Sequence, residues 1–290
     1  MSPKISVIIN CFNSDKYLFE CVESVIAQTY TDFEVVFWDN QSTDTSASIV
    51  KSFNDNRIKY IFAPEHTPLG LARNLAAAEA SGEWIAFLDA DDLWCKDKLM
   101  MQMDLVKSSS ANLGLVYSRV QLITELGASI PMVNLYSRII SKIKAHSEKN
   151  IFQLLLNGNF IIFSSLLVKK ECFYSVGGIN PDLEQNEDFD LILKISDSNS
   201  AACTHQSLAS YRIHGANTSL KNGLKNFEET DLILSSLPKS SAVVDAIRHN
   251  KTKQSLFLLL NNDYINGVKL FIVGGSFLIA LKLIYNRFKG

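Results

Sequence analysis

The order of its apolar segments constrains the fold of this chain more than any other feature. From residue 5 to about residue 118, short runs rich in β-branched and aromatic residues alternate with longer stretches in which apolar residues recur at helical spacing. Such alternation is typical of βαβ units, in which a helix connects neighbouring parallel strands. The apolar runs predict strands at 5–11, 33–38, 58–62, 84–88 and 113–117. We therefore expect an α/β fold with a mixed, mainly parallel sheet flanked by helices.

The helices follow from the remaining periodicity. After the first strand, apolar residues from Leu18 to Ile26 lie on one helical face, which predicts a helix packed on the sheet. An alanine-rich run from about residue 71 to 80 predicts a second helix, and Gly82 suits a left-handed residue at its end. Further elements are expected at three places: a strand within 160–168, a helix at 188–195, and mostly helical structure from about residue 223.

The composition excludes several classes of protein. The chain has 28 Lys and Arg against 30 Asp and Glu, a net charge of −2, which argues against general nucleic-acid binding. Hydrophobic residues make up 47% and charged residues 20%, which excludes a disordered chain. The five cysteines are widely spaced and indicate neither a disulfide framework nor a zinc site. The N-terminus lacks a secretory signal pattern, so we expect a cytoplasmic protein.

Polar residues at the ends of the predicted strands are candidates for a ligand site, because ligands of open α/β sheets bind outside the carboxyl ends of the strands. The second strand ends in Asp39 and Asn40, and the fourth is followed by Asp89, Asp91 and Asp92. Three neighbouring carboxylates repel one another unless a cation neutralises them. Because Mg²⁺ typically binds one or two carboxylates together with substrate phosphates, the pattern indicates a phosphate-bearing substrate.

Seven short motifs give the sequence a more specific meaning. They are SVIINCFN (6–13), QTY (28–30), DNQSTD (39–44), GLARN (70–74), LDADD (88–92), ED (187–188) and YRIH (211–214). In this order they resemble the motifs of family 2 glycosyltransferases, and the resemblance covers roughly residues 4 to 215. It implies the Rossmann-like GT-A fold and a catalytic domain at 1–218, with a nucleotide-sugar half at about 1–118 and an acceptor half at about 119–218. A helical C-terminal region at 219–290 would follow.

By this resemblance, the ends of the first two strands bind the base and ribose of a nucleoside-diphosphate sugar. The matching residues are Asn10, Phe12, Asp39 and Asn40. An aspartate accepts a hydrogen bond from the ring N–H of uracil or thymine, whereas an asparagine presents both a donor and an acceptor. A UDP-sugar is the first expectation for the donor substrate, and a dTDP-sugar is the second.

The resemblance also implies a diphosphate and metal site. Arg73 would pair with the diphosphate or hold the carboxylates of the acidic turn, and the alternative is a surface salt bridge. Asp91 is the principal ligand expected for Mn²⁺ or Mg²⁺, with Asp89 nearer the ribose or the water shell of the metal. His214 would lie near the diphosphate and complete the metal shell. Asp92 is expected to cap the following helix.

Glu187 and Asp188 match the catalytic pair of the family. Taken alone, two acids in the first turn of a helix are ordinary, since they complement the helix dipole. The resemblance implies instead that Asp188 is the general base for the acceptor hydroxyl and that Glu187 supports it or binds the acceptor. It further implies single displacement with inversion. Together with the cytoplasmic location, the affinity for membranes expected of the C-terminal segment suggests a glycan or lipid-linked acceptor in surface polysaccharide assembly.

Residues 268–285 are largely apolar, but Lys269 and Lys282 interrupt them. As a helix they would reach about 27 Å, which is marginal against about 30 Å of hydrocarbon. Residues 264–290 carry four basic residues and no acids, which suits peripheral contact with an anionic inner leaflet. The alternatives are packing on the catalytic domain or on a second subunit of a homo-oligomer.

Three other functions stay open as alternatives. A dinucleotide-dependent oxidoreductase would use Asp39 on the ribose, but NCFNSDKY after the first strand lacks the G-x-G-x-x-G loop. A phosphatase or phosphotransferase would need its nucleophilic aspartate after the first strand, which ends in Asn10. The third alternative is a non-catalytic, nucleotide-sugar-binding partner of another transferase. In each case residues 119–150 are expected to form a mobile, substrate-facing insertion.

Overall fold

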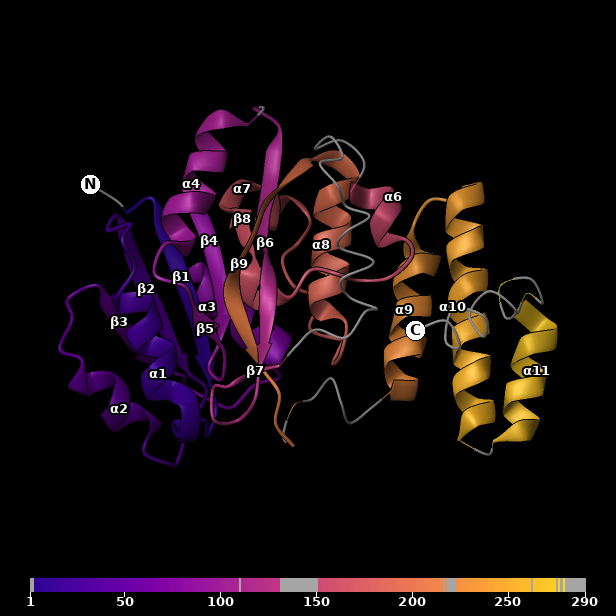
Figure 1. Ribbon diagram of the computed structural model, residues 1–290, viewed down its shortest axis with the longest axis horizontal. Helices are drawn as coiled ribbons and strands as arrows, with labels where there is room; N and C mark the ends of the chain where they lie inside the picture. Colours follow the sequence, from indigo (N-terminus) through magenta and orange to yellow (C-terminus); the bar gives the residue numbers. More distant parts are fainter. Residues whose placement is uncertain are drawn as a thin grey trace. The chain divides into compact units, whose positions relative to one another are not determined.

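A computed structural model describes residues 3–109, 111–130, 151–215, 217, 223–261, 263–274, 276 and 279. These residues form two compact units (Figure 1). Among the described residues, unit 1 holds those within 3–130, residue 151 and residues 161–214, and unit 2 holds 152–160 together with those from 215 onward.

The described residues of unit 1 form a nine-stranded sheet. One half of it consists of four parallel strands in the spatial order β3-β2-β1-β4 (Figure 1). Their bounds are β1 Ile5–Cys11, β2 Phe33–Asp39, β3 Ile58–Phe62 and β4 Trp84–Asp89. The apolar runs predicted these four strands to within one residue, since β1, β2 and β4 are buried almost throughout.

The other half of the sheet contains both strand directions. β8 (Leu167–Lys169) is antiparallel to both of its neighbours, β4 and β6 (Leu113–Ile123), so β6 again runs parallel to β4. β9 (Ser200–Arg212) pairs in parallel with β6. Two short strands, β5 (Leu93–Trp94) and β7 (Ser129–Ile130), add antiparallel pairs to β9 and β6. The expected mixed, mainly parallel sheet is confirmed, with β6 as the fifth predicted strand.

Residues 160–168 form a strand only at their end, which corrects the expectation for this segment. Phe163–Ser165 form a 3₁₀ turn, η1, and β8 begins at Leu167. The hydroxyl of Ser165 donates to the carbonyl of Ile162 at 2.7 Å. Such local side-chain to backbone bonds compete with a strand ladder and favour a turn.

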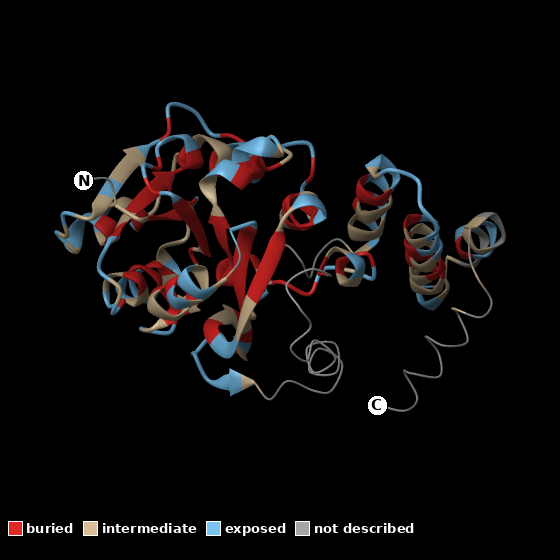
Figure 2. Cartoon of the chain, turned by 90° about the horizontal axis from the view of Figure 1, so that it is seen from above, coloured by how far each residue is buried: buried red, intermediate tan, exposed pale blue. Residues whose placement is uncertain are grey.

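Six helices accompany the sheet within the described part of unit 1. Their bounds are α1 Asp15–Ile26, α2 Ser46–Ser52, α3 Leu69–Ala78, α4 Lys98–Ser108, α7 Lys170–Ser175 and α8 Glu187–Ser198. α1 buries the predicted face, with Leu18 and Val25 fully inside and Ile26 only partly. Figure 2 shows the buried residues concentrated along the strands and the exposed residues on the outer turns.

Gly82 does not end a helix in the left-handed conformation, which corrects the expectation for it. Its φ is not positive, and α3 ends four residues earlier at Ala78. A Cβ at Gly82 would lie 2.6 Å from the nitrogen of Ser6 and 2.7 Å from the carbonyl carbon of Ile5. The glycine is therefore needed because the loop before β4 passes directly against the backbone of β1.

Unit 2 is helical in its described part, as predicted for the C-terminal region. It contains most of α6 (Ile151–Leu155) and the three helices α9 (Gly223–Ser236), α10 (Ser241–Leu260) and α11 (Tyr264–Gly274). α10 lies between and packs on both α9 and α11 (Figure 1). Ser240 caps α10 by accepting a hydrogen bond from the backbone N–H of Val243.

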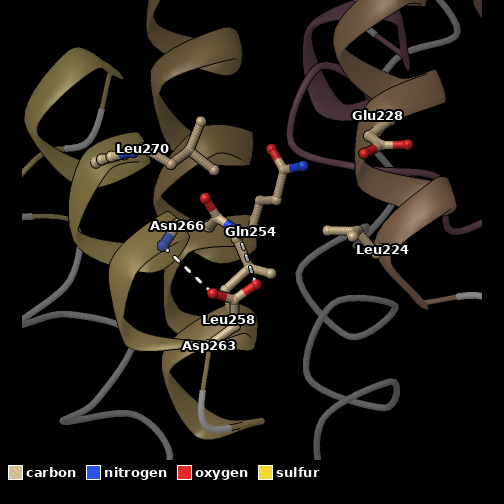
Figure 3. A pocket seen from close by; sticks show the side chains of 8 residues that line it. Leu224, Glu228, Gln254, Leu258, Asp263, Asn266 and Leu270 are labelled. Atoms are coloured by element: carbon tan, nitrogen blue, oxygen red, sulfur yellow. Dashed lines mark hydrogen bonds between the residues drawn. The ribbon is translucent and has the colours of Figure 1, made fainter.

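An open cavity of about 390 Å³ lies among α9, α10 and α11 (Figure 3). Leucines from all three helices line it, and the amide of Gln254 and the carboxylate of Glu228 also reach it. Most of the apolar stretch beyond residue 274 lies outside the described residues, and so does the larger part of the insertion expected at 119–150. At the start of that insertion, residues 119–123 belong to β6 and residues 129–130 form β7, which corrects the expectation for this part. Among the described residues, no helix combines the length and apolar character that crossing a bilayer requires.

Candidate functional site

The candidate site lies where the carboxyl ends of β1, β2 and β4 meet at one edge of the sheet. Cys11 is in register with Asp39, and Asn10 is in register with both Trp38 and Asp89. The predicted residues of the first, second and fourth strands are therefore neighbours in space, because parallel strands end at the same edge.

Asp39 is fully buried and its carboxylate is held from two sides. One oxygen accepts a hydrogen bond from the backbone N–H of Ser42 at 2.7 Å, and the other accepts one from the hydroxyl of Tyr60 at 2.6 Å. Burial, and then the bond to Asp39, raise the pKa of Tyr60 above its usual value. Tyr60 therefore stays a neutral donor and fixes the orientation of Asp39.

Asn40 is buried, and its side chain faces the loop after β3. Its amide nitrogen donates to the carbonyl of Thr67 at 2.7 Å, and its amide oxygen accepts from the N–H of Thr67 at 3.2 Å. The backbone carbonyl of Asn40 accepts from Nδ1 of His66 at 2.9 Å. Asn40 thereby sets the path of the loop that carries His66.

His66 and the predicted residue Phe12 form an exposed aromatic pair beside this edge. Their ring centroids are 4.2 Å apart, and 48% of Phe12 is exposed. None of the sequence motifs includes His66, although one signal points to it. His66 follows the third predicted strand, and the residues after that strand belong to the same edge of the sheet.

Asn10, also predicted, has a buried amide nitrogen that makes no hydrogen bond in the described part of the chain. A buried donor without a protein partner is costly unless a water or a ligand accepts from it. Asn10 lies between the end of β2 and Asp89 on β4. Its amide is therefore placed to donate to a ligand at this edge.

Arg73 is buried within the site and is not part of a surface salt bridge. Its Nη2 donates to Asp89 at 2.6 Å and its Nη1 donates to Glu187 at 2.7 Å, while its guanidinium lies 4.3 Å from the ring centre of Phe163. Charge-assisted bonds of a planar guanidinium fix direction as well as distance. One cation therefore links the end of β4 to the start of α8.

Glu187 and Asp188 open α8, and their environments differ. Glu187 is buried, and its Oε2 has no hydrogen-bond partner among the described residues. Asp188 is partly exposed, and its Oδ1 accepts from the N–H of Phe189 at 2.6 Å. Burial, and then the charge of Glu187, raise the pKa of Asp188 to about 7. A carboxylate with such a pKa can accept a proton near neutral pH.

Asp91 and His214 form the candidate metal pair. Oδ2 of Asp91 lies 2.7 Å from Nε2 of His214, and burial together with the charge of Asp89 raises the pKa of Asp91. Among the described residues no group of three or more His, Cys, Asp or Glu has a metal-binding arrangement. One carboxylate and one imidazole fit a divalent ion that also binds substrate phosphates and water. Asp89, the other predicted ligand, is held by Arg73 instead.

Asp92 does not cap α4, which corrects the expectation for it. It is fully buried, and it accepts from the hydroxyl of Ser164 at 2.5 Å and from the backbone N–H of Arg212 at 2.9 Å. The residue before α4 is Asp97. Asp92 is turned inward because the short strand β5 separates the acidic turn from the helix. It ties that turn to η1 and to the end of β9.

The comparison with protein families decides the class of this site. Residues 6–170 match the model of "Glycosyl transferase family 2", which covers more than half of the chain. The chain belongs to glycosyltransferase family 2. The match begins at the first strand of the sheet and includes the acidic turn, so the enzyme class agrees with the motifs quoted above.

Known proteins similar to this glycosyltransferase include an uncharacterized glycosyltransferase of Rickettsia typhi, 25% identical, with 97% of this chain and 84% of the relative covered. The UDP-Glc:alpha-D-GlcNAc-diphosphoundecaprenol beta-1,3-glucosyltransferase WfgD of Escherichia coli is 34% identical over 41% of this chain and 46% of its own. The mannosyltransferase PcManGT of Pyrobaculum calidifontis, solved with GDP-Man and Mn²⁺, superposes with a TM-score of 0.67 at 18% identity. It covers 99% of this chain and 80% of its own, and it supports the GT-A fold.

Proposed function

We propose that this family 2 enzyme transfers a sugar from a UDP-sugar, or next a dTDP-sugar, to an acceptor hydroxyl with inversion. The observation that carries the proposal is the pair of hydrogen bonds that buried Arg73 donates, one to Asp89 and one to Glu187. These bonds join the nucleotide edge of the sheet to Glu187, the residue before the candidate base Asp188. A donor sugar and an acceptor can then be held against each other at one place.

The nucleotide would bind at the edge formed by β1, β2 and the loop after β3. Phe12 and His66 offer an exposed aromatic surface for the base, and Asn10 offers its unpaired amide donor. Asp39 still has acceptor capacity beyond its bonds to Ser42 and Tyr60, because a carboxylate accepts up to about four hydrogen bonds. The donor named for the Escherichia coli relative, UDP-glucose, supports the choice of uridine.

Asp91 and His214 would hold Mn²⁺ or Mg²⁺, and Asp89 would face the ribose or the diphosphate next to Arg73. Nε2 of His214 must be unprotonated to bind a cation. When bound, the ion neutralises charge on the departing diphosphate. The Mn²⁺ of the Pyrobaculum relative supports this assignment.

Asp188 would act as the general base. Its carboxylate takes the proton of the acceptor hydroxyl as that oxygen bonds to the anomeric carbon and the bond to the diphosphate breaks. The proton ends on Asp188 and the electron pair leaves with the diphosphate. The positive charge of Arg73 favours the ionised form of Asp188, which keeps the base available at this partly exposed place.

The acceptor would be a glycan or a lipid-linked sugar, as the named substrate of the Escherichia coli relative suggests. We assign the catalytic domain to residues 1–218 and the helical C-terminal region to 219–290, with peripheral contact through 264–290 at the inner face of the membrane. A contact with a second copy of the chain is the alternative use of this region. A non-catalytic binding partner of another transferase is the alternative to catalysis.

Calorimetric titration of UDP, dTDP and GDP, with and without Mn²⁺, tests the donor site. We expect UDP to bind most tightly with Mn²⁺, and Asp91→Ala to weaken that binding about 10- to 100-fold. Asp104→Ala, which removes an exposed carboxylate on α4, is the matched control and should bind as the wild type does. The proposal would be overturned if the nucleotides bound equally well with and without Mn²⁺, or if none of the three bound.

A further inference from the structure

Arg212 is almost fully buried and makes hydrogen bonds to two residues of the acidic turn. Its Nε donates to the backbone carbonyl of Asp91 at 2.9 Å, and its own backbone N–H donates to the carboxylate of Asp92 at 2.9 Å. Its Nη1 donates to the carbonyl of Glu125, in the turn between β6 and β7, at 2.9 Å. One residue therefore fixes the positions of two successive residues of the turn.

Arg212 and His214 act on Asp91 from the same side. Side chains two residues apart in an extended chain point to the same face, and Ile213 continues the ladder of β9 by donating to Ile123. Arg212 thus reaches the carbonyl of Asp91, while His214 reaches its carboxylate at 2.7 Å. The ring of Tyr17 backs both groups, with its centre 4.5 Å from the guanidinium and 5.2 Å from the imidazole ring centre.

A positively charged group next to metal ligands normally repels the metal, but the carboxylate of Glu20 balances the charge of Arg212. Nη2 of Arg212 donates to the carboxylate of Glu20 on α1 at 2.6 Å. The side chain of Glu20 is 58% exposed. Because Arg212 contacts Asp91 through the carbonyl and has its charge balanced by Glu20, the carboxylate of Asp91 stays available for a cation.

We propose that Glu20 and Arg212 are positioning residues for the metal pair Asp91 and His214, with Arg212 placing the pair and Glu20 balancing its charge. The inference rests on the proposed function, since it takes the ion of that same site. Neither residue is required to touch the substrate. Outer partners that orient metal ligands typically change metal affinity by about 10- to 100-fold when they are removed.

The decisive comparison is between Glu20→Gln and Glu23→Gln in the full chain. Both variants remove one negative charge from α1, but Glu23 is exposed, and among the described residues it is Glu20 that forms the ion pair with Arg212. Free Mn²⁺, followed by electron paramagnetic resonance in the presence of UDP, reports metal binding directly. We expect Glu20→Gln to raise the Mn²⁺ dissociation constant about threefold or more, and Glu23→Gln to leave it unchanged.

A second variant, Arg212→Lys, keeps the charge but cannot span both carbonyls and the carboxylate of Glu20. We expect it to raise the Mn²⁺ constant about tenfold or more, with UDP affinity restored at saturating Mn²⁺. A merely structural role would weaken UDP binding at every Mn²⁺ concentration and would not be rescued. Should Arg212→Lys fail to fold, the exposed Glu20 still carries the test.

The possible outcomes distinguish a failure of the positioning role of Glu20 and Arg212 from a failure of the proposed function. If the wild type binds no Mn²⁺, the metal site and the inference are both overturned. If the wild type binds Mn²⁺ and the two glutamate variants behave alike, only the inference is overturned. The same holds if Arg212→Lys binds Mn²⁺ as tightly as the wild type does.

Discussion

Asp188 shows how strongly one environment can change one carboxylate. An exposed aspartate ionises near pH 4. Burial and the neighbouring Glu187 raise the pKa of Asp188 to about 7, although Arg73 opposes the shift. The paired acid Glu187 bonds to Arg73 directly, and the positive charge of Arg73 also acts on Asp188. The raised pKa makes the carboxylate of Asp188 a stronger base than that of an exposed aspartate, so Asp188 is suited to take a proton.

The pH dependence of the reaction should follow this ionisation. We expect kcat/KM to rise with pH until about 7, with a slope of one on a logarithmic plot, and then to level, because only ionised Asp188 accepts the proton. Asp188→Asn should lower kcat about 10²- to 10⁴-fold with little change in KM for the donor. Asp197→Asn, an exposed change on the same helix, is the control for steady-state assays. A profile that is flat from pH 5 to 8 would contradict the role of Asp188.

Because the pKa of Asp188 is raised in the folded state, we expect Asp188→Asn to increase the free energy of unfolding. A raised pKa in the folded state means that stability is lost as pH rises from about 4 through about 7. The uncharged variant escapes this loss, so its gain should be larger at pH 8 than at pH 5. We expect about 2 kcal/mol at pH 8 after allowing for partial exposure. Urea unfolding at both pH values measures it, and an equal gain at both would refute the environment inferred here.

At the scale of elements, the site depends on how closely the connecting segments approach the strands. The loop before β4 touches the backbone of β1 at Gly82, and η1 touches the acidic turn through Ser164. Ser164 accepts from the N–H of Asp89 and donates to Asp92, so the turn has no freedom to move away from β4. The order of elements alone would not produce this contact, because it joins residues more than 70 positions apart.

Gly82→Ala should destabilise unit 1. The added Cβ would meet backbone atoms of Ser6 and Ile5 at 2.6 and 2.7 Å, and backbone cannot move aside as a flexible side chain can. Overpacking of this kind costs about 1–3 kcal/mol, which urea unfolding can resolve. Gly215→Ala is the matched control, since a Cβ there meets nothing within 4 Å. Equal stabilities of the two variants would show that the close approach at Gly82 is not rigid.

At the scale of the whole molecule, the candidate site residues all belong to unit 1. The three tryptophans of the sequence, Trp38, Trp84 and Trp94, lie on β2, β4 and β5 and belong to the same unit. Unit 2 contributes helices but no tryptophan. Tryptophan fluorescence therefore reports unfolding of the unit that would bind the nucleotide.

UDP with Mn²⁺ should raise the unfolding midpoint detected by tryptophan fluorescence. At about 100 times its dissociation constant, a ligand adds about 2.7 kcal/mol to the folded state. For a unit of this size that corresponds to about 5 °C or more. Asp91→Ala should lose most of the shift under the same conditions. An undiminished shift in that variant would separate nucleotide binding from Asp91.

Much of the architecture could be predicted from the sequence because it depends on local patterns. The parallel strands are continuous apolar runs, and α1 has its apolar residues on one face, so periodicity alone located them. Motif order then indicated the family and the edge of the sheet at which the polar residues gather. Residues 160–168 were predicted wrongly as one strand, since the hydroxyl of Ser165 bonds to the nearby backbone of Ile162 and the strand begins only at Leu167.

Tertiary structure alone decided which of these residues touch. The bond from Arg73 to Glu187 spans 114 positions, and the bond from Arg212 to Glu20 spans 192. The sequence pattern indicates which face of a segment is buried but not which distant side chain contacts it. The contacts of Arg212 and of His66 could therefore not be predicted. Asp92 points inward to accept from Ser164 and from the backbone of Arg212, and the pKa of Asp188 is raised by burial and by the charge of Glu187. Both effects exist only once the chain has folded.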